Sequence, residues 1–243
     1  MRESRIRRRR CFLARHVFAI GDLHLSSQGK TMDIFGSHWK DHHKRLKDNW
    51  TRTVRPEDIV LIAGDLSWAL KLREAMADLE WIGSLPGTKI IIRGNHDYWW
   101  TSRGKVNSVL PGGMTAVNAN AWTRDNLSVV GTRGWNLPGT GKFSETDYKI
   151  YVRELNRLKI ALEHVPSTNS HTIVAVLHFP PLTKTILSSG FTQLLESFGV
   201  AACVYAHFHG EDQKIAFEGN RNGVSYFFVS CDYLDFQPRK IEL

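Results

Sequence analysis

Short runs of apolar, mainly β-branched residues alternate along this chain with longer segments whose apolar residues recur every three or four positions. Runs of the first kind are typical of strands buried on both faces, and the longer segments are typical of amphipathic helices. Alternation of this kind predicts an α/β fold, in which helices cover the sheets. Strands are expected at residues 16–22, 58–65, 89–95, 127–134, 172–178 and 200–207, and helices at residues 71–85, 145–165 and 191–199.

Two segments outside this alternation complete the expected layout. Residues 214–231, KIAFEGNRNGVSYFFVSC, predict a final hairpin that turns near residues 219–223. Residues 26–43 show no clear apolar period, so we expect a long functional loop or a cap over a site. Residues 16–243 are numerous enough to bury a large core, and we expect them to form a single domain.

The net charge of +8 is concentrated at the beginning of the chain. Seven arginines and one glutamate in residues 1–15 account for six of these eight charges, so the rest of the chain is nearly neutral. We expect residues 1–15 to form a basic arm that is disordered or extended. Such an arm can bind polyanions or an acidic membrane surface, although a solvated tail is the simpler interpretation.

Cysteine content and hydropathy favour a cytoplasmic protein. Cys11, Cys203 and Cys231 are widely separated and form no CxxC motif, so a disulfide framework is not expected. No run of about 18 apolar residues is present, so the sequence predicts no transmembrane segment.

Side chains that can bind metals follow nearly every expected strand. In open α/β sheets, ligands bind at the carboxyl ends of the strands, so these side chains should converge. Asp22 and His24, like His207 and His209, are two residues apart, which in extended backbone places both members of each pair on one face. Carboxylate, amide and imidazole groups without a thiolate suit Mn, Fe or Zn. The predicted metal ligands are Asp22, His24, Asp65, Asn95, His178, His207 and His209.

A centre with two divalent cations would suit chemistry at phosphorus. Two such cations outweigh the negative charge of Asp22 and Asp65, so the site would attract an anion. Two metals about 3.5–4 Å apart, with an activated hydroxide between them, clamp the attacking and leaving oxygens of an in-line displacement. We therefore expect two divalent ions and a substrate that is a phosphorylated small molecule or a phosphodiester.

Five short motifs follow one another along the chain: GDLH (21–24), GDLSW (64–68), GNHD (94–97), HFPP (178–181) and AHFHG (206–210). In this order they resemble the DxH, GD, GNH[DE], isolated His and GHxH motifs of the calcineurin-like metallophosphoesterases. The resemblance implies a four-layer sandwich of two mixed β-sheets flanked by helices. One departure is Ala206, which stands where family members usually have Gly. We expect only a slight backbone adjustment there.

The resemblance also implies how the ligands are divided between the two metals. One metal would take Asp22, His24 and His209. The other would take Asn95, His178 and His207. The carboxylate of Asp65 would be shared by both.

The same resemblance implies the catalytic groups. A hydroxide that bridges the metals would attack phosphorus, and His96 would be the general acid that protonates the leaving oxygen. Asp97 would hold His96, fix its tautomer and raise its pKa.

Several side chains near the expected strand ends are candidates for substrate binding. The aromatic residues Trp68, Tyr98 and Trp99 can stack on a base or a sugar, although large aromatic side chains more often fill a core. Arg93 and Arg133 can bind a phosphate through two hydrogen bonds each, but structural ion pairs explain them equally well.

Three functions remain open from the sequence. The leading hypothesis is a metal-dependent hydrolase of phosphate mono- or diesters. A non-catalytic module could use the same metal-binding scaffold for interaction, although none of the predicted ligands is missing. A nuclease would use the Arg-rich arm to bind nucleic acid, and its binding would then weaken steeply with salt. The natural substrate is not predicted.

Overall fold

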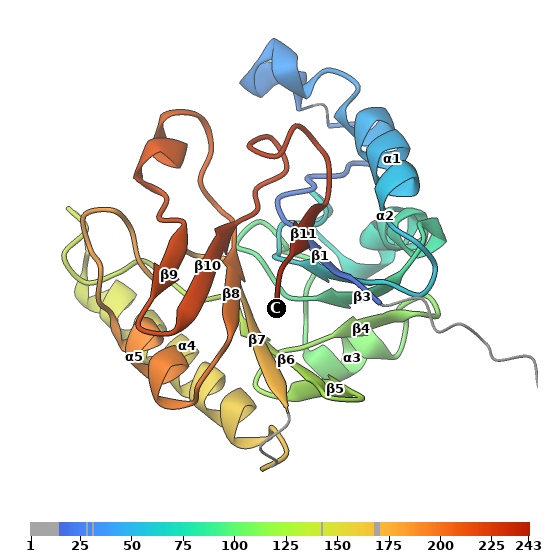
Figure 1. Cartoon of the computed structure of the whole chain (residues 1–243). Coiled ribbons are helices and arrows are strands. Elements are labelled where there is room, and N and C mark those ends of the chain that lie inside the picture. Colours follow the sequence, from blue (N-terminus) through green and yellow to red (C-terminus); the bar gives the residue numbers. More distant parts are fainter. Residues whose placement is uncertain (1–14, 28, 31, 142, 168–170) are drawn as a thin grey trace, which may run out of the picture.

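Two mixed β-sheets pack face to face at the centre of the fold, as Figure 1 shows for our computed structural model. The structure describes residues 15–27, 29–30, 32–141, 143–167 and 171–243. Within them, the first sheet contains, in spatial order, β11 (Arg239–Ile241), β1 (Val17–Ile20), β2 (Ile59–Ile62), β3 (Thr88–Ile91) and β4 (Met114–Ala116). The second sheet contains β5 (Ala121–Arg124), β6 (Leu127–Thr132), β7 (Thr172–Leu177), β8 (Ala202–Tyr205), β10 (Val224–Phe228) and β9 (Gly219–Arg221).

Neighbouring strands are parallel in the middle of each sheet and antiparallel at every edge except the one formed by β4. β11 runs antiparallel to β1, and β5 and β9 run antiparallel to β6 and β10. The remaining neighbours are parallel, which requires a long crossover between successive strands. These crossovers contain most of the helices.

Helices cover the outer face of each sheet and complete four layers. Helices α1 (His42–Thr53), α2 (Leu72–Ser84) and α3 (Arg103–Asn107) contribute to the apolar core over the first sheet. Helices α4 (Glu145–Glu163) and α5 (Gly190–Ser197) cover the second sheet (Figure 1). A third core of aliphatic side chains lies between the sheets. This arrangement confirms the predicted α/β sandwich.

The expected strands and helices are all present, with ends up to four residues shorter than the apolar pattern suggested. Helix α1 was not expected, because only His42, Leu46 and Trp50 form its buried face and the rest of the helix is strongly polar. The short elements α3, β4, β5 and β11 were also missed, because none is long enough to show a period.

The final hairpin is confirmed, with β9 paired to β10 through a turn in which Asn222 and Gly223 both have positive φ. The segment expected to be a loop or cap contains two 3-10 helices, η1 (Asp33–Phe35) and η2 (Ser37–Trp39), before α1 begins. A third 3-10 helix, η3 (Gly210–Ile215), follows β8.

Residues 1–14 of the predicted basic arm, on which the nuclease alternative depends, lie outside the described residues. Arg15 contacts the folded domain, since its guanidinium donates to the Glu57 carbonyl and pairs with Asp125 at 2.8 Å. Among the helices that the structure describes, none is both long enough and apolar enough to span a bilayer.

Candidate metal centre

The loops that follow five strands bring the predicted ligands together at one edge of the two sheets. Asp22 and His24 follow β1, and Asp65 follows β2. The other four are Asn95 after β3, His178 after β7, and His207 and His209 after β8. Ligand atoms of five of these seven residues form two groups that share Asp22, each with atoms within 4.8 Å of one another. The convergence expected from the strand ends is therefore present.

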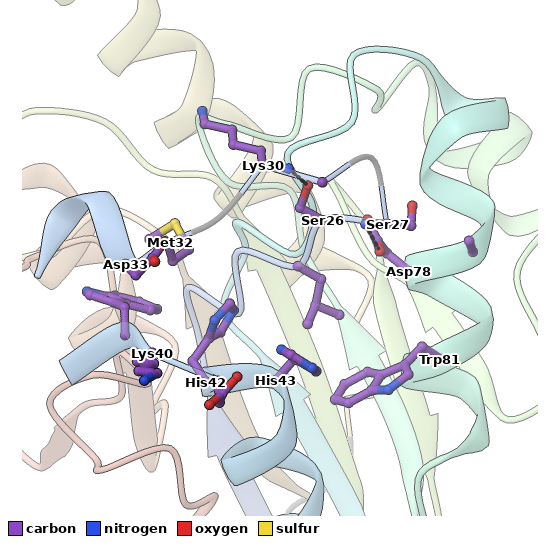
Figure 2. Close-up of a pocket in the computed structure, with 15 residues that line it drawn as sticks. Ser26, Ser27, Lys30, Met32, Asp33, Lys40, His42, His43, Asp78 and Trp81 are labelled. Carbon is purple, nitrogen blue, oxygen red and sulfur yellow. Dashed lines mark hydrogen bonds between the residues drawn. The ribbon is translucent and has the colours of Figure 1, made fainter. Parts of the chain in front are cut away.

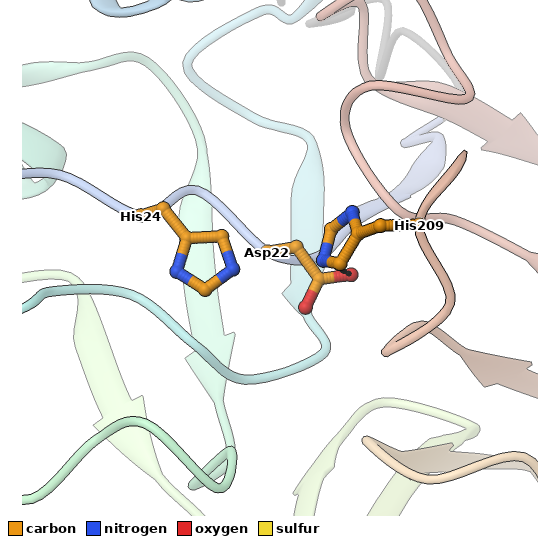
Figure 3. Close-up of side chains that lie close together, drawn as sticks. All are labelled: Asp22, His24 and His209. Atoms are coloured by element: carbon orange, nitrogen blue, oxygen red, sulfur yellow. Dashed lines mark ion pairs between the residues drawn. The ribbon is translucent and has the colours of Figure 1, made fainter. Parts of the chain in front are cut away.

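The first group consists of Asp22, His24 and His209 (Figure 3). Asp22 and His24 lie at the end of the first sheet, and His209 reaches them from the second. His209 Nε2 lies 3.8 Å from Asp22 Oδ2, and His24 Nε2 lies 3.9 Å from the nearest oxygen of Asp65. Three groups capable of binding one cation therefore surround a common point.

The second group consists of Asp22, Asp65 and His178, all of them buried. His178 Nε2 lies 3.4 Å from Asp65 Oδ2 and 2.7 Å from Asn95 Oδ1. The Nδ1 atom of His207 is 3.3 Å from the same His178 nitrogen. Each of the seven predicted ligands thus lies in or beside one of two adjoining groups.

Two buried ligand atoms in the centre have no hydrogen-bond partner among the residues that the structure describes. They are Asp22 Oδ1 and His24 Nδ1. A buried carboxylate oxygen or imidazole nitrogen without a partner is costly, because it has lost water and gained nothing in return. Donors of this kind, oxygen from carboxylates and nitrogen from imidazoles, are the usual ligands of divalent transition metals. The residues therefore fit the cations that the sequence implies.

The backbone at the centre has an unusual conformation that the sequence reasoning did not foresee. Asp22, His24, Asp65 and His207 have φ values of 56°, 44°, 51° and 80°. Residues other than glycine rarely adopt positive φ, which costs about 1–3 kcal/mol each and is commonest at functional sites. The expectation that both His-containing pairs lie in extended backbone is wrong. Tight left-handed turns, and not strand geometry, aim these side chains at the centre.

Residues after β10 form a second layer of contacts that was also missed. Ser230 donates its hydroxyl to Asp22 Oδ2 at 2.5 Å, and the Cys231 thiol donates to the Asp22 carbonyl. His209 Nδ1 lies 3.0 Å from Asp232 Oδ1, the carboxylate–histidine contact that commonly orients a metal ligand. The signal was present in the sequence, because Ser230 and Asp232 are polar residues that follow an apolar run, as the predicted ligands do.

Burial and neighbouring charges divide the histidines of the centre into two kinds. Burial lowers the pKa of His24 to about 3 and that of His207 well below its usual value. Burial also acts to lower the pKa of His178, but Asp65 and Asp22 outweigh it and raise the value to about 9. For His209, Asp22 and Asp232 outweigh burial in the same way, and its pKa is also about 9.

His96 lies on the wall of a cavity of about 290 Å³ that opens beside the first ligand group. Its ring is 5.8 Å from that of His24 and 4.7 Å from that of Trp68. Its backbone N–H donates to Asp65 Oδ1 at 2.7 Å, so the position of His96 depends on a ligand carboxylate. Burial lowers the pKa of the half-buried imidazole, contrary to the expected rise.

Asp97 does not hold the imidazole of His96, and this expectation is corrected. Among the described residues its carboxylate accepts hydrogen bonds from the backbone N–H groups of Asp65, Leu66, Ser67 and Gly94, and from the indole of Trp99. Burial and the nearby Asp65 raise its pKa to about 6. Asp97 therefore fixes the loop after β2 against the loop after β3.

The expected substrate-binding aromatics have different positions. Trp68 lines the 290 Å³ cavity and stacks on His24, with ring centroids 4.8 Å apart. Tyr98 is 56% exposed and lies edge-on to His96 at 6.1 Å. Trp99 is only 1% exposed and donates to Asp97, so its assignment to the substrate site is wrong and it belongs to the core. Its neighbour Trp100 is buried as well.

The segment after β1 covers the centre, as the lack of a period in residues 26–43 suggested. Met32, Phe35, His38 and Trp39 from this segment line the 290 Å³ cavity. A larger cavity of about 450 Å³ lies between the same segment and α2 (Figure 2). Met32 and Trp39 line both cavities, so these side chains form the wall between them.

Arg93 and Arg133 do not line the cavity beside His96. They line a separate, smaller cavity with Glu154. Arg133 lies 3.9 Å from Glu154 and 4.3 Å above the ring of Trp135, and burial together with neighbouring arginines lowers its pKa to about 10.

Solved structures of low sequence identity share this fold. The phosphopantetheinyl hydrolase PptH from Mycobacterium tuberculosis superposes with a TM-score of 0.58 at 16% identity, over 93% of this chain and 95% of that chain. TT1561 of Thermus thermophilus superposes with a TM-score of 0.52 at 14% identity, over 81% of this chain and 83% of that chain. These likenesses support the four-layer fold.

Sequence comparisons agree with the motifs. Gene 66 protein of Mycobacterium phage D29 is 34% identical over 82 residues, which span 34% of this chain and 40% of that protein. The sequence model of the family described as Calcineurin-like phosphoesterase matches residues 15–211, which include all seven predicted ligands. With the family's five motifs assembled around one centre, this match shows that the chain belongs to the calcineurin-like phosphoesterases.

Proposed function

We propose that this protein is a metal-dependent hydrolase of phosphate mono- or diesters, with two divalent ions held by the seven predicted ligands. The observation that carries the proposal is the pair of adjoining groups that share Asp22 and contain buried, unpartnered ligand atoms beside a cavity. Family membership supports the same chemistry. PptH, which shares the fold, is described as a hydrolase.

The ligand residues would be divided as the motifs imply. Bound divalent ions would supply Lewis acidity and an activated water for attack at phosphorus. Asp22, His24 and His209 would hold one ion, and Asn95, His178 and His207 the other. Asp65 would serve both, a role supported by its Oδ2 atom, which lies 3.4 Å from His178 and 3.9 Å from His24. Mn, Fe or Zn would suit this donor set.

His96 would protonate the leaving oxygen. It lines the cavity without belonging to either ligand group, and the backbone bond to Asp65 fixes its distance from the centre. A lowered pKa makes the protonated imidazole a stronger acid, although a smaller fraction of it is protonated at neutral pH. Such a group transfers its proton readily to a departing alkoxide.

The cavity beside His96 would receive the organic part of the ester. Trp68, Trp39 and Phe35 give it aromatic walls, and the Trp68 and Phe35 rings are nearly parallel, 11° apart. Lys30 also lies over the Trp68 ring, with Nζ 3.2 Å from the ring centroid. A planar or apolar group would bind well there. Tyr98, exposed beside His96, is a second candidate contact.

The decisive experiment measures hydrolysis of p-nitrophenyl phosphate and bis-p-nitrophenyl phosphate with Mn²⁺, after chelation, and after restoration of the ion. Turnover that disappears with the ion and returns with it is the expected result, and the preferred ester shows whether the protein is a mono- or diesterase. Asp65→Asn should abolish turnover, because it changes a predicted ligand. Asp235→Asn changes an exposed carboxylate outside the ligand set and should not. Metal binding without turnover of any ester would favour the interaction-module alternative.

Cell fractionation would test the cytoplasmic location that the cysteine spacing favours.

A further inference from the structure

The smallest of the three cavities described, of about 50 Å³, lies where the two sheets and α4 meet. Arg93 enters it from the loop after β3, Arg133 from the end of β6, and Glu154 and Arg157 from α4. The polar residues Thr101, Asn118 and Thr132 and the apolar residues Trp100 and Val117 complete its wall. A single water needs about 10–15 Å³ of such space, so the cavity accommodates a group of a few heavy atoms.

Positive charge dominates this cavity. Its charged lining residues are three arginines and one glutamate, which leaves a net charge of +2. Glu154 is fully buried, and its Oε1 atom is shared by Arg157 at 2.6 Å, Arg153 at 3.3 Å and Arg133 at 3.9 Å. Its Oε2 atom accepts the hydroxyl of Thr132. One carboxylate therefore cannot satisfy the donors that surround it.

Arg93 has the clearest unused donor. Its Nε is buried and has no hydrogen-bond partner within the described part of the chain. A guanidinium carries five N–H donors in a planar fork, which matches the oxygens of a phosphate or a carboxylate. Buried donors with no partner are costly, so a site of this kind gains most from an oxyanion.

The cavity adjoins the candidate metal centre through two loops. Arg93 is two residues before Asn95, so their Cα atoms are at most about 7 Å apart. The Arg133 carbonyl accepts the backbone N–H groups of His178 and Phe179, at 3.1 and 2.9 Å. A substrate held at the metal centre by one phosphoester could therefore extend a second charged group toward the arginines.

We infer that the cavity lined by Arg93, Arg133 and Arg157 is an oxyanion subsite that binds a second phosphate or carboxylate group of the substrate. The inference rests on the proposed function and narrows it to esters that carry two anionic groups. Glu154 limits the strength of binding by neutralising part of the charge, and it keeps Arg157 directed into the cavity.

The first test measures binding of inorganic phosphate to the protein kept in chelator, so that metal binding does not contribute. Arg157→Gln should weaken phosphate binding by at least about tenfold, because it removes a charged donor. Arg153→Gln is the matched control, since Arg153 is also on α4 and also contacts Glu154 but is 52% exposed and does not line the cavity. Equal binding by wild type and Arg157→Gln would overturn the inference.

A reciprocal variant guards against a folding defect in Arg157→Gln. Glu154→Gln removes the only negative charge of the cavity lining and should tighten phosphate binding several-fold. A purely structural role for the cluster predicts no such gain. Failure of Glu154→Gln to strengthen binding, in a protein that unfolds cooperatively, would contradict the charge argument even if Arg157→Gln does not fold.

The second test asks whether the cavity binds an anionic group carried by the substrate or only free phosphate. 3-Phosphoglycerate carries a carboxylate where glycerol 3-phosphate has a hydroxymethyl group. The two compounds are compared as competitors of p-nitrophenyl phosphate hydrolysis with Mn²⁺. Arg157→Gln should weaken competition by 3-phosphoglycerate at least about tenfold and leave that by glycerol 3-phosphate unchanged. Equal effects on both competitors, or phosphate binding that never competes, would overturn the assignment to substrate. If p-nitrophenyl phosphate shows no metal-dependent turnover, the proposed function fails, while the chelator experiment still decides whether the cavity binds anions.

Discussion

A Cβ atom placed on Gly21 would lie only 2.5 Å from the Cβ of Ala206. Gly21 directly follows β1 of one sheet, and Ala206 directly follows β8 of the other, so the two motif loops touch at this point. Family resemblance leads one to expect glycine at position 206. The methyl group of Ala206 is accommodated because residue 21 has none.

Gly21→Ala should therefore destabilise the protein by about 1–3 kcal/mol, the usual cost of an added methyl group in a packed interior. The double variant Gly21→Ala with Ala206→Gly should recover part of this loss. Recovery will be incomplete, because the added Cβ would also lie 3.1 Å from the Cβ of Ala63. Denaturant unfolding of the four proteins in a double-mutant cycle measures the coupling. Strictly additive effects would contradict a contact between the two methyl groups.

Asp97→Asn should weaken metal binding although Asp97 is not a ligand. All five of its hydrogen-bond partners are N–H donors, and an amide NH₂ in its place would face one or more of them. We expect a loss of about 2–4 kcal/mol in unfolding free energy, together with weaker Mn²⁺ binding. Asp235→Asn, a change at a 92% exposed side chain, is the matched control. Unchanged stability and metal affinity in Asp97→Asn would show that the two loops do not need this carboxylate.

His96→Ala should retain its metals and lose turnover. A general acid contributes about 10²–10⁴-fold, and most where the leaving group is a poor one, so alkyl phosphates should suffer far more than p-nitrophenyl phosphate. Elemental analysis checks metal content, and kcat for both ester types checks the role. His38→Ala removes another histidine of the same cavity wall and should show no leaving-group dependence. Equal losses on both ester types would refute the acid role of His96.

Metal binding should tighten as pH rises toward 9 and should release protons. His178 and His209, with pKa values of about 9, are protonated at neutral pH and must lose a proton before a ring nitrogen binds a cation. In this pH range His24 and His207, whose pKa values are lowered, are already neutral and add no proton. Calorimetry of Mn²⁺ binding in buffers of different ionisation enthalpy measures the protons released. Affinity independent of pH between 6 and 9 would contradict the expected competition.

Protonation of His178 and His209 should stabilise the folded, metal-free protein. Their pKa values are raised in the folded protein, so their contribution to metal-free stability is complete below the ordinary histidine pKa of 6.5 and is lost as pH rises through about 9. Unfolding of the chelated protein from pH 6 to 9.5, compared with His209→Gln, isolates the contribution of His209.

The sequence predicts the layers of the fold and the strand ends at which the candidate ligands converge, for one physical reason. Buried parallel strands need continuous apolar runs, so a polar residue that ends such a run is conspicuous, as Asp65 and His178 are. Positive φ at the ligands leaves no such trace, since the ligands that adopt it are aspartate and histidine and not glycine. Short elements such as β4 and α3 are equally hard to foresee.

Roles that depend on where a side chain points are the least predictable from sequence. Tyr98 and Trp99 are neighbours directly after the GNHD motif, yet Trp99 is buried in the core and Tyr98 is exposed, because the tight turn after Asp97 separates their directions. Asp97 itself follows His96 directly but turns to backbone N–H groups. A linear motif identifies which residues meet and does not reveal which atoms face one another.

The two ligand groups each draw residues from both sheets, and this has a thermodynamic consequence. Asp22, His24 and Asp65 belong to the first half of the chain, whereas His178 and His209 belong to the second, and each group needs both. A bound cation would therefore link the two halves of the chain in the folded state. By mass action, an ion present at 100 times its dissociation constant raises the free energy of unfolding by about 2.7 kcal/mol. Scarcity of the ion would then limit the lifetime of the folded enzyme as well as its turnover.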